Sequence, residues 1–223
     1  MVRKLKSYLA PWFWRIPKKE QHWVYSPSPG PHKKFECIPL AIILRNILKI
    51  VDTGKEAETV VKKGEVKIDG RVVKDFRYPV GLFDTIIIEK IEKYYRVVPF
   101  KGGLTVKEIG KEESNLKICK VVNRTVVKNG NIQLNLHDGK NIIYNEKVNT
   151  QSSLLLELPT LRILDVINLD VGNYVVSIAG NHGIIKNYDK KTKIVYFSRD
   201  GESFSTSVKY VYVVGREKPL ITI

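Results

Sequence analysis

The sequence predicts an α+β protein, in which a small domain of two helices and a sheet precedes two small antiparallel β domains. Between residues 40 and 61, apolar residues recur at helical spacing, which predicts a pair of neighbouring helices. After Gly102 and Gly103 this period disappears, and strand-like runs alternate with turn dipeptides. The 223 residues can hold two to three small domains, and 43% hydrophobic residues exclude a mostly disordered chain.

The composition favours an anionic partner. With 38 Lys and Arg against 23 Asp and Glu, the net charge is +15, which favours nucleic acid first and an anionic membrane surface second. The two cysteines, Cys37 and Cys119, are far apart and lack metal-spaced partners, so a disulfide scaffold is excluded and neither a metal nor a cofactor is expected. The longest apolar run, residues 37–44, is too short to span a bilayer. We therefore expect a cytoplasmic protein without a membrane partner.

The first 35 residues differ from the rest in charge and composition. They carry eight Lys or Arg and one acid, all three tryptophans and five of the ten prolines. Because proline is excluded from helix interiors and central strands, we predict a basic extended arm over residues 1–35. Its tryptophans could pack on the protein or stack on bases, and we expect the arm to order on nucleic acid, the alternative being a solvated tail. The candidate contacts are Arg3, Lys4, Lys6, Trp12, Trp14, Arg15, Lys18, Lys19, Trp23, His32, Lys33 and Lys34.

The next segment predicts two helices. Pro39 suits the first turn of a helix, and apolar residues then follow helical spacing through residue 48. Arg45 lies off this apolar stripe, so it is a further candidate contact for nucleic acid. Thr53 and Glu56 form a capping-box pattern that begins a second helix, and Gly64 is placed to end it in a left-handed conformation.

A small sheet is predicted to follow the helices. Residues 65–73 alternate and contain the dipeptide Asp69-Gly70, which is a strong signal for a two-residue hairpin turn. The apolar residues 85–88 and the run 94–98 predict two more strands. The predicted domain therefore covers residues 36–100.

The motifs of this domain resemble a known RNA-binding domain. T-G-K-E-A at residues 53–57, K-K-G-E-V-K-I-D-G-R-V at 62–72 and V-G-L-F-D-T-I-I-I at 80–88 are similar to the small domain first described in ribosomal protein four of the small subunit. The resemblance implies an RNA surface formed by the start and exposed face of the second helix and by the following hairpin. Carried over by position, its residues are Thr53, Lys55, Lys62, Lys63, Lys67 and Arg71.

Residues 101–170 predict a central antiparallel β domain. Its strand-like runs are residues 117–122, 125–127, 132–136, 141–144, 154–158 and 163–167. The connecting dipeptides Asn129-Gly130 and Asp138-Gly139 favour primed turns, in which φ is positive. We therefore interpret Asp138 as a turn residue rather than as an acid–base catalyst.

Residues 171–223 predict a second small β domain. Its predicted strands are residues 174–178, 183–187, 194–197 and 210–214. The stretch V-V-S-I-A-G-N-H-G-I-I at 175–185 resembles the KOW motif of ribosomal and transcription-elongation proteins. This resemblance implies an SH3-like barrel whose glycine-bearing loop contacts RNA or protein, the alternative being a plain hairpin with a glycine turn. The candidate RNA contacts here are Asn181, His182 and Lys186.

The order of these parts resembles one family of archaeal and eukaryotic small-subunit ribosomal proteins, that of type four with an "e" suffix, and its archaeal branch in particular. The most specific pieces are residues 27–32, 79–84, 133–141 and 215–219. The resemblance implies a structural constituent of the ribosome in the cytoplasm. It would bind small-subunit rRNA and neighbouring small-subunit ribosomal proteins, without a cofactor or a homo-oligomer.

Two other functions stay open. A free RNA-binding regulator of translation or transcription could use the KOW-like barrel. A pseudouridine synthase carries the same RNA-binding domain, but it also needs a catalytic domain with a reactive Asp, and the residues after position 100 already predict two β domains. The sequence contains no phosphate-binding glycine loop, zinc-protease helix or nucleophile elbow, so no catalytic residue is predicted.

Overall fold

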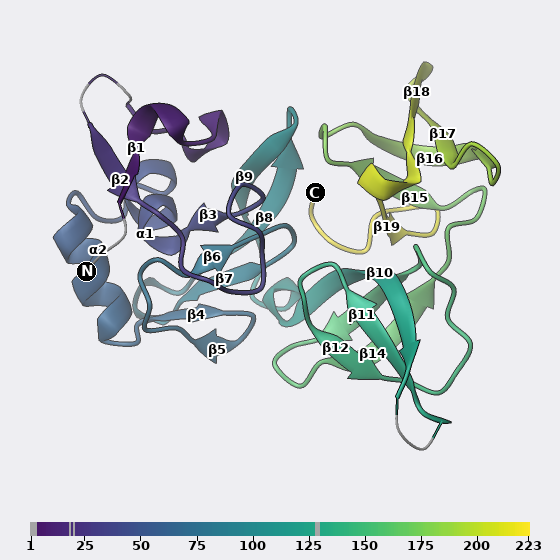
Figure 1. Ribbon diagram of the computed structural model, residues 1–223, viewed down its shortest axis with the longest axis horizontal. Helices are drawn as coiled ribbons and strands as arrows, with labels where there is room; N and C mark the ends of the chain where they lie inside the picture. The colour runs from purple at the N-terminus through teal and green to yellow at the C-terminus, as the bar shows by residue number, and fades with distance from the viewer. Residues whose placement is uncertain (1–3, 18, 20, 128–129) are drawn as a thin grey trace. The chain divides into compact units, whose positions relative to one another are not determined.

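The computed structural model describes residues 4–17, 19, 21–127 and 130–223. The protein is mostly β with few helices (Figure 1). It divides into two compact units, of which the first is Met1–Val98 with Gly103–Ser114 and the second is Pro99–Gly102 with Asn115–Ile223. Within the described residues, no helix is long and apolar enough to cross a membrane.

The N-terminal segment is folded into the first unit, which differs from the extended arm predicted from its prolines. Strand β1 (Lys4–Lys6) pairs antiparallel with β2 (Trp23–Tyr25), and two short 3-10 helices, η1 (Ser7–Leu9) and η2 (Trp12–Trp14), lie between them. The prolines lie outside both strands, so they do not interrupt the pairing. Trp14 is fully buried, and its Nε1 donates a hydrogen bond to the Cys37 carbonyl oxygen at 2.8 Å. Burial of such apolar side chains stabilises the segment against the protein.

The first predicted helix is short and widened. Pro39 belongs to strand β3 (Ile38–Pro39), which pairs with β6 (Pro79–Val80), and the helix begins only after it. Helix α1 (Leu40–Ile42) passes into a π-helical turn, η3 (Ile43–Ile47), in which the Leu48 amide donates to the Ile43 carbonyl oxygen at 2.9 Å. The wider turn changes the helical register, so Ile47 and Leu48 are only half-buried although the spacing predicted a continuous apolar stripe.

The second helix, α2 (Gly54–Lys62), has the termini that the sequence predicts. The Thr53 hydroxyl oxygen accepts from the Glu56 amide at 3.2 Å, and the Glu56 carboxylate accepts from the Thr53 amide at 3.3 Å, which confirms the capping box. Gly64 follows the helix with φ of +80°, as predicted. Figure 1 shows α2 beside α1 and the β1–β2 pair.

A five-stranded sheet completes the first unit, in the order β5-β4-β7-β8-β9. Its strands are β4 (Val66–Ile68), β5 (Arg71–Val72), β7 (Thr85–Ile88), β8 (Lys93–Phe100) and β9 (Gly103–Glu108). Asp69 and Gly70 have φ of 51° and 74°, which confirms the predicted primed turn between β4 and β5. Arg96 is fully buried beside the Glu113 carboxylate, and its burial lowers the pKa of the guanidinium.

The second unit contains two antiparallel sheets of five strands. The first has the order β12-β11-β10-β13-β14. Its strands are β10 (Leu116–Val126), β11 (Ile132–Leu136), β12 (Asn141–Ile143), β13 (Ser153–Glu157) and β14 (Arg162–Ile167). The two runs predicted at 117–122 and 125–127 form one strand, because a bulge between Val121 and Asn123 takes up the break in alternation.

The predicted turns of this sheet differ in part from the structure. Gly139 has φ of 75°, but Asp138 does not have a positive φ. The Leu136 amide donates to the Lys140 carbonyl oxygen at 2.9 Å, so the turn that this bond closes has three residues rather than two. Gly130 has the predicted positive φ, and Asn129 lies outside the described residues.

The other sheet of the second unit has the order β18-β17-β16-β15-β19. Its strands are β15 (Tyr174–Ser177), β16 (His182–Asp189), β17 (Ile194–Arg199), β18 (Glu202–Ser207) and β19 (Val211–Gly215). A core of aliphatic residues and Phe197 lies against it. Strand β18 was not predicted, because its sequence E-S-F-S-T-S contains a single apolar residue.

Among the described residues of the second unit, two lysines are buried. The Lys117 ammonium lies 2.9 Å from an Asp138 carboxylate oxygen, and both side chains are completely buried. The Lys120 ammonium donates to the carbonyl oxygens of Val208 at 2.6 Å and Val211 at 2.7 Å, and burial lowers the pKa of Lys120 to about 7. Both cations therefore serve the fold and are unavailable to an external anion.

Candidate nucleic-acid interface

The tryptophans of the N-terminal segment do not share one environment. Trp12 and Trp23 are 54% and 53% exposed, so both can stack on an external ring. Trp14, which was also predicted as an RNA contact, is fully buried and its indole is hydrogen-bonded to the main chain, so the ring is not available to stack on an external base. Arg3, Lys18 and the side chain of Lys4 lie outside the described residues.

His32, which was also predicted as an RNA contact, has its imidazole packed inside the first unit. Its imidazole Nε2 lies 2.9 Å from an Asp84 carboxylate oxygen, and both side chains are almost fully buried. The ring rests on Gly81, where a Cβ atom would come within 2.3 Å of the imidazole. The glycine of the V-G-L-F-D motif therefore leaves room for His32.

Most of the other predicted cations of this segment are exposed. Lys6 and Lys19 face solvent, Lys33 pairs with Glu36 at 3.3 Å, and the Lys34 ammonium lies 5.3 Å from the centre of the exposed Phe35 ring. The Arg15 guanidinium donates to the Thr105 hydroxyl at 3.2 Å, which fixes its direction while leaving the residue exposed.

The cations of α2 and the following hairpin fall into two groups. Lys62 pairs with Glu58 at 2.7 Å, and Lys67 pairs with Glu89 at 2.5 Å. In the described part of the chain, the exposed side chains of Lys55, Lys63 and Arg71 make no ion pair or hydrogen bond, so these three are the cations most available to phosphate. Exposed ion pairs contribute only about 0–1 kcal/mol, so the two paired lysines can also exchange a carboxylate for a phosphate.

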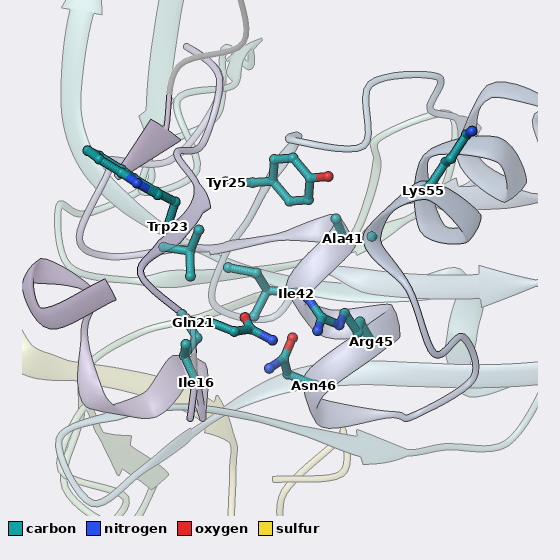
Figure 2. Close-up of a pocket in the computed structure, with 11 residues that line it drawn as sticks. Ile16, Gln21, Trp23, Tyr25, Ala41, Ile42, Arg45, Asn46 and Lys55 are labelled. Atoms are coloured by element: carbon teal, nitrogen blue, oxygen red, sulfur yellow. The ribbon is translucent and has the colours of Figure 1, made fainter. Parts of the chain in front are cut away.

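A pocket in the first unit brings together predicted residues from three segments: Trp23, Arg45 and Lys55 (Figure 2). Its volume is about 230 Å³. It is lined by Ile16, Gln21, Trp23, Val24, Tyr25, Ala41, Ile42, Arg45, Asn46, Gly54 and Lys55. Gln21, Tyr25 and Asn46 were missed because no local motif marks them. The one sequence signal was that Asn46, like Arg45, lies off the apolar stripe of the first helix.

Two contacts fix the walls of this pocket. The Arg45 Nε donates to the Asp52 carbonyl oxygen at 3.2 Å, so the guanidinium is held across the start of α2. A Cβ atom on Gly54 would come within 2.9 Å of the Tyr25 hydroxyl, so this glycine lets the tyrosine lie against the helix. Figure 2 shows Tyr25 on one side, the polar ends of Gln21, Arg45 and Asn46 gathered on the other, and Ile42 between them.

The predicted loop of the last sheet joins β15 to β16. Gly180 has φ of +90°, and the Ser177 amide donates to the Asn181 carbonyl oxygen at 2.8 Å, which closes the turn. Asn181 and Lys186 are exposed, whereas His182 is half-buried with its Nδ1 2.6 Å from the Tyr174 hydroxyl. The loop therefore offers the Asn181 amide to a partner, and strand β16 offers the Lys186 cation.

One cluster in the second unit has metal-binding residue types but is filled by an ammonium group. Ligand atoms of Cys119, His137 and Asp138 lie within 4.8 Å of one another. The Lys117 ammonium lies 2.9 Å from the Asp138 carboxylate, and Lys140 lies 3.3 Å from it. Burial alone would raise the pKa of Asp138, but these lysines and His137 hold it below its ordinary value. The arrangement is that of a buried ion pair.

Comparisons with known proteins identify relatives of every part of the chain. Residues 1–35 match the RS4NT domain, residues 38–86 the S4 domain and residues 91–163 the ribosomal family S4e. A protein of Desulfurococcus amylolyticus named small ribosomal subunit protein eS4 is 39% identical, over 99% of this chain and 95% of its own length. One of the same name from Archaeoglobus fulgidus is 39% identical, over 98% of this chain and 97% of its own length.

A solved structure has a similar fold. The crystal structure of 30S ribosomal protein S4e from Thermoplasma acidophilum matches with a TM-score of 0.71 and 29% sequence identity. The match covers 81% of this chain and 96% of that one.

Proposed function

Because this chain belongs to the S4e family of ribosomal proteins, we propose that it is a structural constituent of the small ribosomal subunit, where it binds and stabilises folded rRNA. The observation that carries the proposal is 39% identity over 99% of the chain to a protein named small ribosomal subunit protein eS4. These relatives are structural ribosomal proteins rather than enzymes, which argues against a pseudouridine synthase.

The proposed RNA surface is made by exposed cations and aromatic rings. Lysine and arginine side chains neutralise phosphates and release counterions with little reading of base sequence. The side chains of Lys55, Lys63 and Arg71 are exposed to solvent, which supports these residues as the main phosphate contacts of the S4 domain. Further proposed contacts of this domain are Thr53, Lys62 and Lys67. The remaining proposed contacts are Lys6, Trp12, Arg15, Lys19, Trp23, Lys33, Lys34, Arg45, Asn181, His182 and Lys186.

The proposed division of the chain follows the four segments expected from the sequence. Residues 1–35 form the basic segment, and residues 36–100 form an RNA-binding domain with a helix pair and a sheet. Residues 101–170 form the central β domain, and 171–223 form an SH3-like barrel with a KOW-type loop. The two separate five-stranded sheets of the second unit support the last boundary.

The proposed place of action is the ribosome in the cytoplasm. Neighbouring small-subunit proteins are the expected protein partners, and one copy per subunit is expected. The exposed Asn181 amide of the loop between β15 and β16 and the exposed Lys186 of β16 suit either an RNA or a protein neighbour.

A sucrose gradient of native cell lysate tests the function. The chain should sediment stoichiometrically with the small subunit at low salt and at moderately high salt. Recovery only at the top of the gradient, or with complexes the size of an RNA polymerase, would contradict the proposal and favour a free RNA-binding regulator.

A further inference from the structure

The pocket of Figure 2 has a chemistry that phosphate contacts alone do not use. Its floor is apolar, because Ala41 and Ile42 are buried and Val24 is 6% exposed. Two aromatic residues of β2, Trp23 and Tyr25, also line it. A phosphate would gain nothing from these apolar and aromatic walls, whereas a flat ring with polar edges fits them.

The size of the pocket limits its ligand to a small ring system. Its volume of about 230 Å³ lies below the range of roughly 300–1,000 Å³ that is typical of pockets for drug-sized ligands. Trp23 keeps 53% of its surface exposed, so its indole is free to cover a ring that enters. Aromatic side chains accept bases in this way because every base has a π-face.

The polar groups of the pocket match the edge of a base. The Asn46 amide offers donors and an acceptor, which is the pattern that pairs with base edges. The Gln21 amide can turn its oxygen to the Arg45 guanidinium, which leaves its NH2 group to donate to a base. The Arg45 guanidinium adds donors, and its bond to the Asp52 carbonyl oxygen holds it in position before a ligand arrives. Figure 2 shows these three polar ends gathered at one side of the pocket.

We propose that this pocket binds one unstacked base of the small-subunit rRNA, with Trp23 covering the base and Gln21, Arg45 and Asn46 contacting its edge. This inference rests on the proposed function. It adds a contact with a single base to an RNA surface whose other cations are proposed to bind phosphates. Figure 2 shows the Lys55 ammonium pointing away from the pocket. The backbone of an RNA whose base fills the pocket would therefore pass along α2, where Lys55 and Lys62 lie two turns apart.

The test uses the full chain bound to small-subunit rRNA. Ultraviolet cross-linking with mass spectrometry should join Trp23 or Tyr25 to one nucleotide, and chemical probing should show that nucleotide protected. Trp23→Ala should weaken binding about 5- to 100-fold, as expected for one base stacked on an aromatic ring. It should also expose that nucleotide while the rest of the footprint stays. Asn46→Ala should expose the same nucleotide with a smaller loss of affinity.

Tyr8→Ala is the matched control, because Tyr8 is an exposed aromatic residue of the same segment that does not line the pocket. If Trp23→Ala and Tyr8→Ala give the same footprint, and no pocket residue cross-links to RNA, the single-base pocket is refuted while rRNA binding stands. Tight binding of free AMP or UMP, or a Trp23 cross-link to a protein in assembled subunits, would also refute it. Failure of the wild-type chain to bind rRNA at all would instead refute the proposed function.

Discussion

Replacing Asp138 with Asn is expected to destabilise the second unit by about 3–5 kcal/mol, the cost of leaving a buried charge without its partner. Asp138 and Lys117 are completely buried, and their charged atoms lie 2.9 Å apart. Asparagine keeps the size of the side chain and an oxygen for the Lys140 amide, which donates to Asp138 at 3.2 Å. The change therefore removes the carboxylate charge with little change in packing.

A second substitution separates this charge effect from a loss of packing. Lys117→Met combined with Asp138→Asn should recover at least about 2 kcal/mol, because the buried ammonium that Asp138 neutralised is removed as well. Arg216→Ala is the control, since it breaks an ion pair with Asp165 in which the arginine is 69% exposed, and it should cost less than about 1 kcal/mol.

The assay is urea unfolding followed by far-ultraviolet circular dichroism, with amide hydrogen exchange in β10 and β13 reporting on the second unit. All three tryptophans lie in the first 35 residues, so their emission reports on the first unit. A cost below about 1 kcal/mol for Asp138→Asn, or a double variant no more stable than the single one, would refute the reasoning.

The same pair predicts a direction with pH. Burial opposes the charge of Asp138, but the neighbouring cations outweigh it and lower its pKa. A carboxylate with a lowered folded pKa stabilises the fold above its unfolded pKa of about 3.9 and loses that contribution as the pH falls further. The stability difference between wild type and Asp138→Asn should therefore stay constant from pH 7 to about pH 5 and shrink below about pH 4. A difference that shrinks above pH 5 would contradict this.

Three further predictions concern other positions. Burial lowers the pKa of Lys120 to about 7, so unfolding takes up a proton above pH 7. The free energy of unfolding of wild type, relative to that of Lys120→Met, should therefore rise by up to about 1.4 kcal/mol per pH unit between pH 7 and 10 in urea titrations. A stability difference that does not change with pH would mean that the carbonyl oxygens keep the Lys120 ammonium charged. Lys55→Ala and Lys63→Ala should each weaken rRNA binding and reduce the slope of log K against log salt by about 1 in filter binding, and an unchanged slope would exclude the phosphate contact. Trp14→Ala should cost about 3–5 kcal/mol in thermal unfolding and Trp12→Ala less than about 0.5, and equal losses would contradict the assigned burial.

The sequence predicted the features that depend on neighbours within a few residues. The capping box of Thr53 and Glu56, the left-handed Gly64 and the primed turn at Asp69 each follow from local backbone chemistry. The two-residue turn predicted at Asp138 is wrong, because tertiary contacts outweigh the local preference of this dipeptide. Asp138 is drawn into an ion pair with Lys117, 21 positions away, and its dipeptide forms a longer connection than its residues favour.

The roles of Trp14 and His32 could not be predicted from the sequence. Their partners, Cys37 and Asp84, lie 23 and 52 positions away, and nothing in a basic, proline-rich segment marks which aromatic ring is buried. The pocket could not be predicted for the same reason, since its residues come from the loop before β2, from β2 itself, from the first helix and from the start of the second. Composition could only indicate that the partner is anionic.

The distribution of the cations explains how a chain of net charge +15 can both fold and hold an anion. Arg96 and Lys117 are buried against carboxylates, and the buried Lys120 donates to carbonyl oxygens, so each is compensated inside the protein. Lys55 and Lys63 are left at the surface of α2, where mutual repulsion is small in water and falls further when phosphates arrive. Cations that stabilise the fold are thus separated from cations that can bind RNA. Substitutions in the two groups should therefore affect stability and affinity independently.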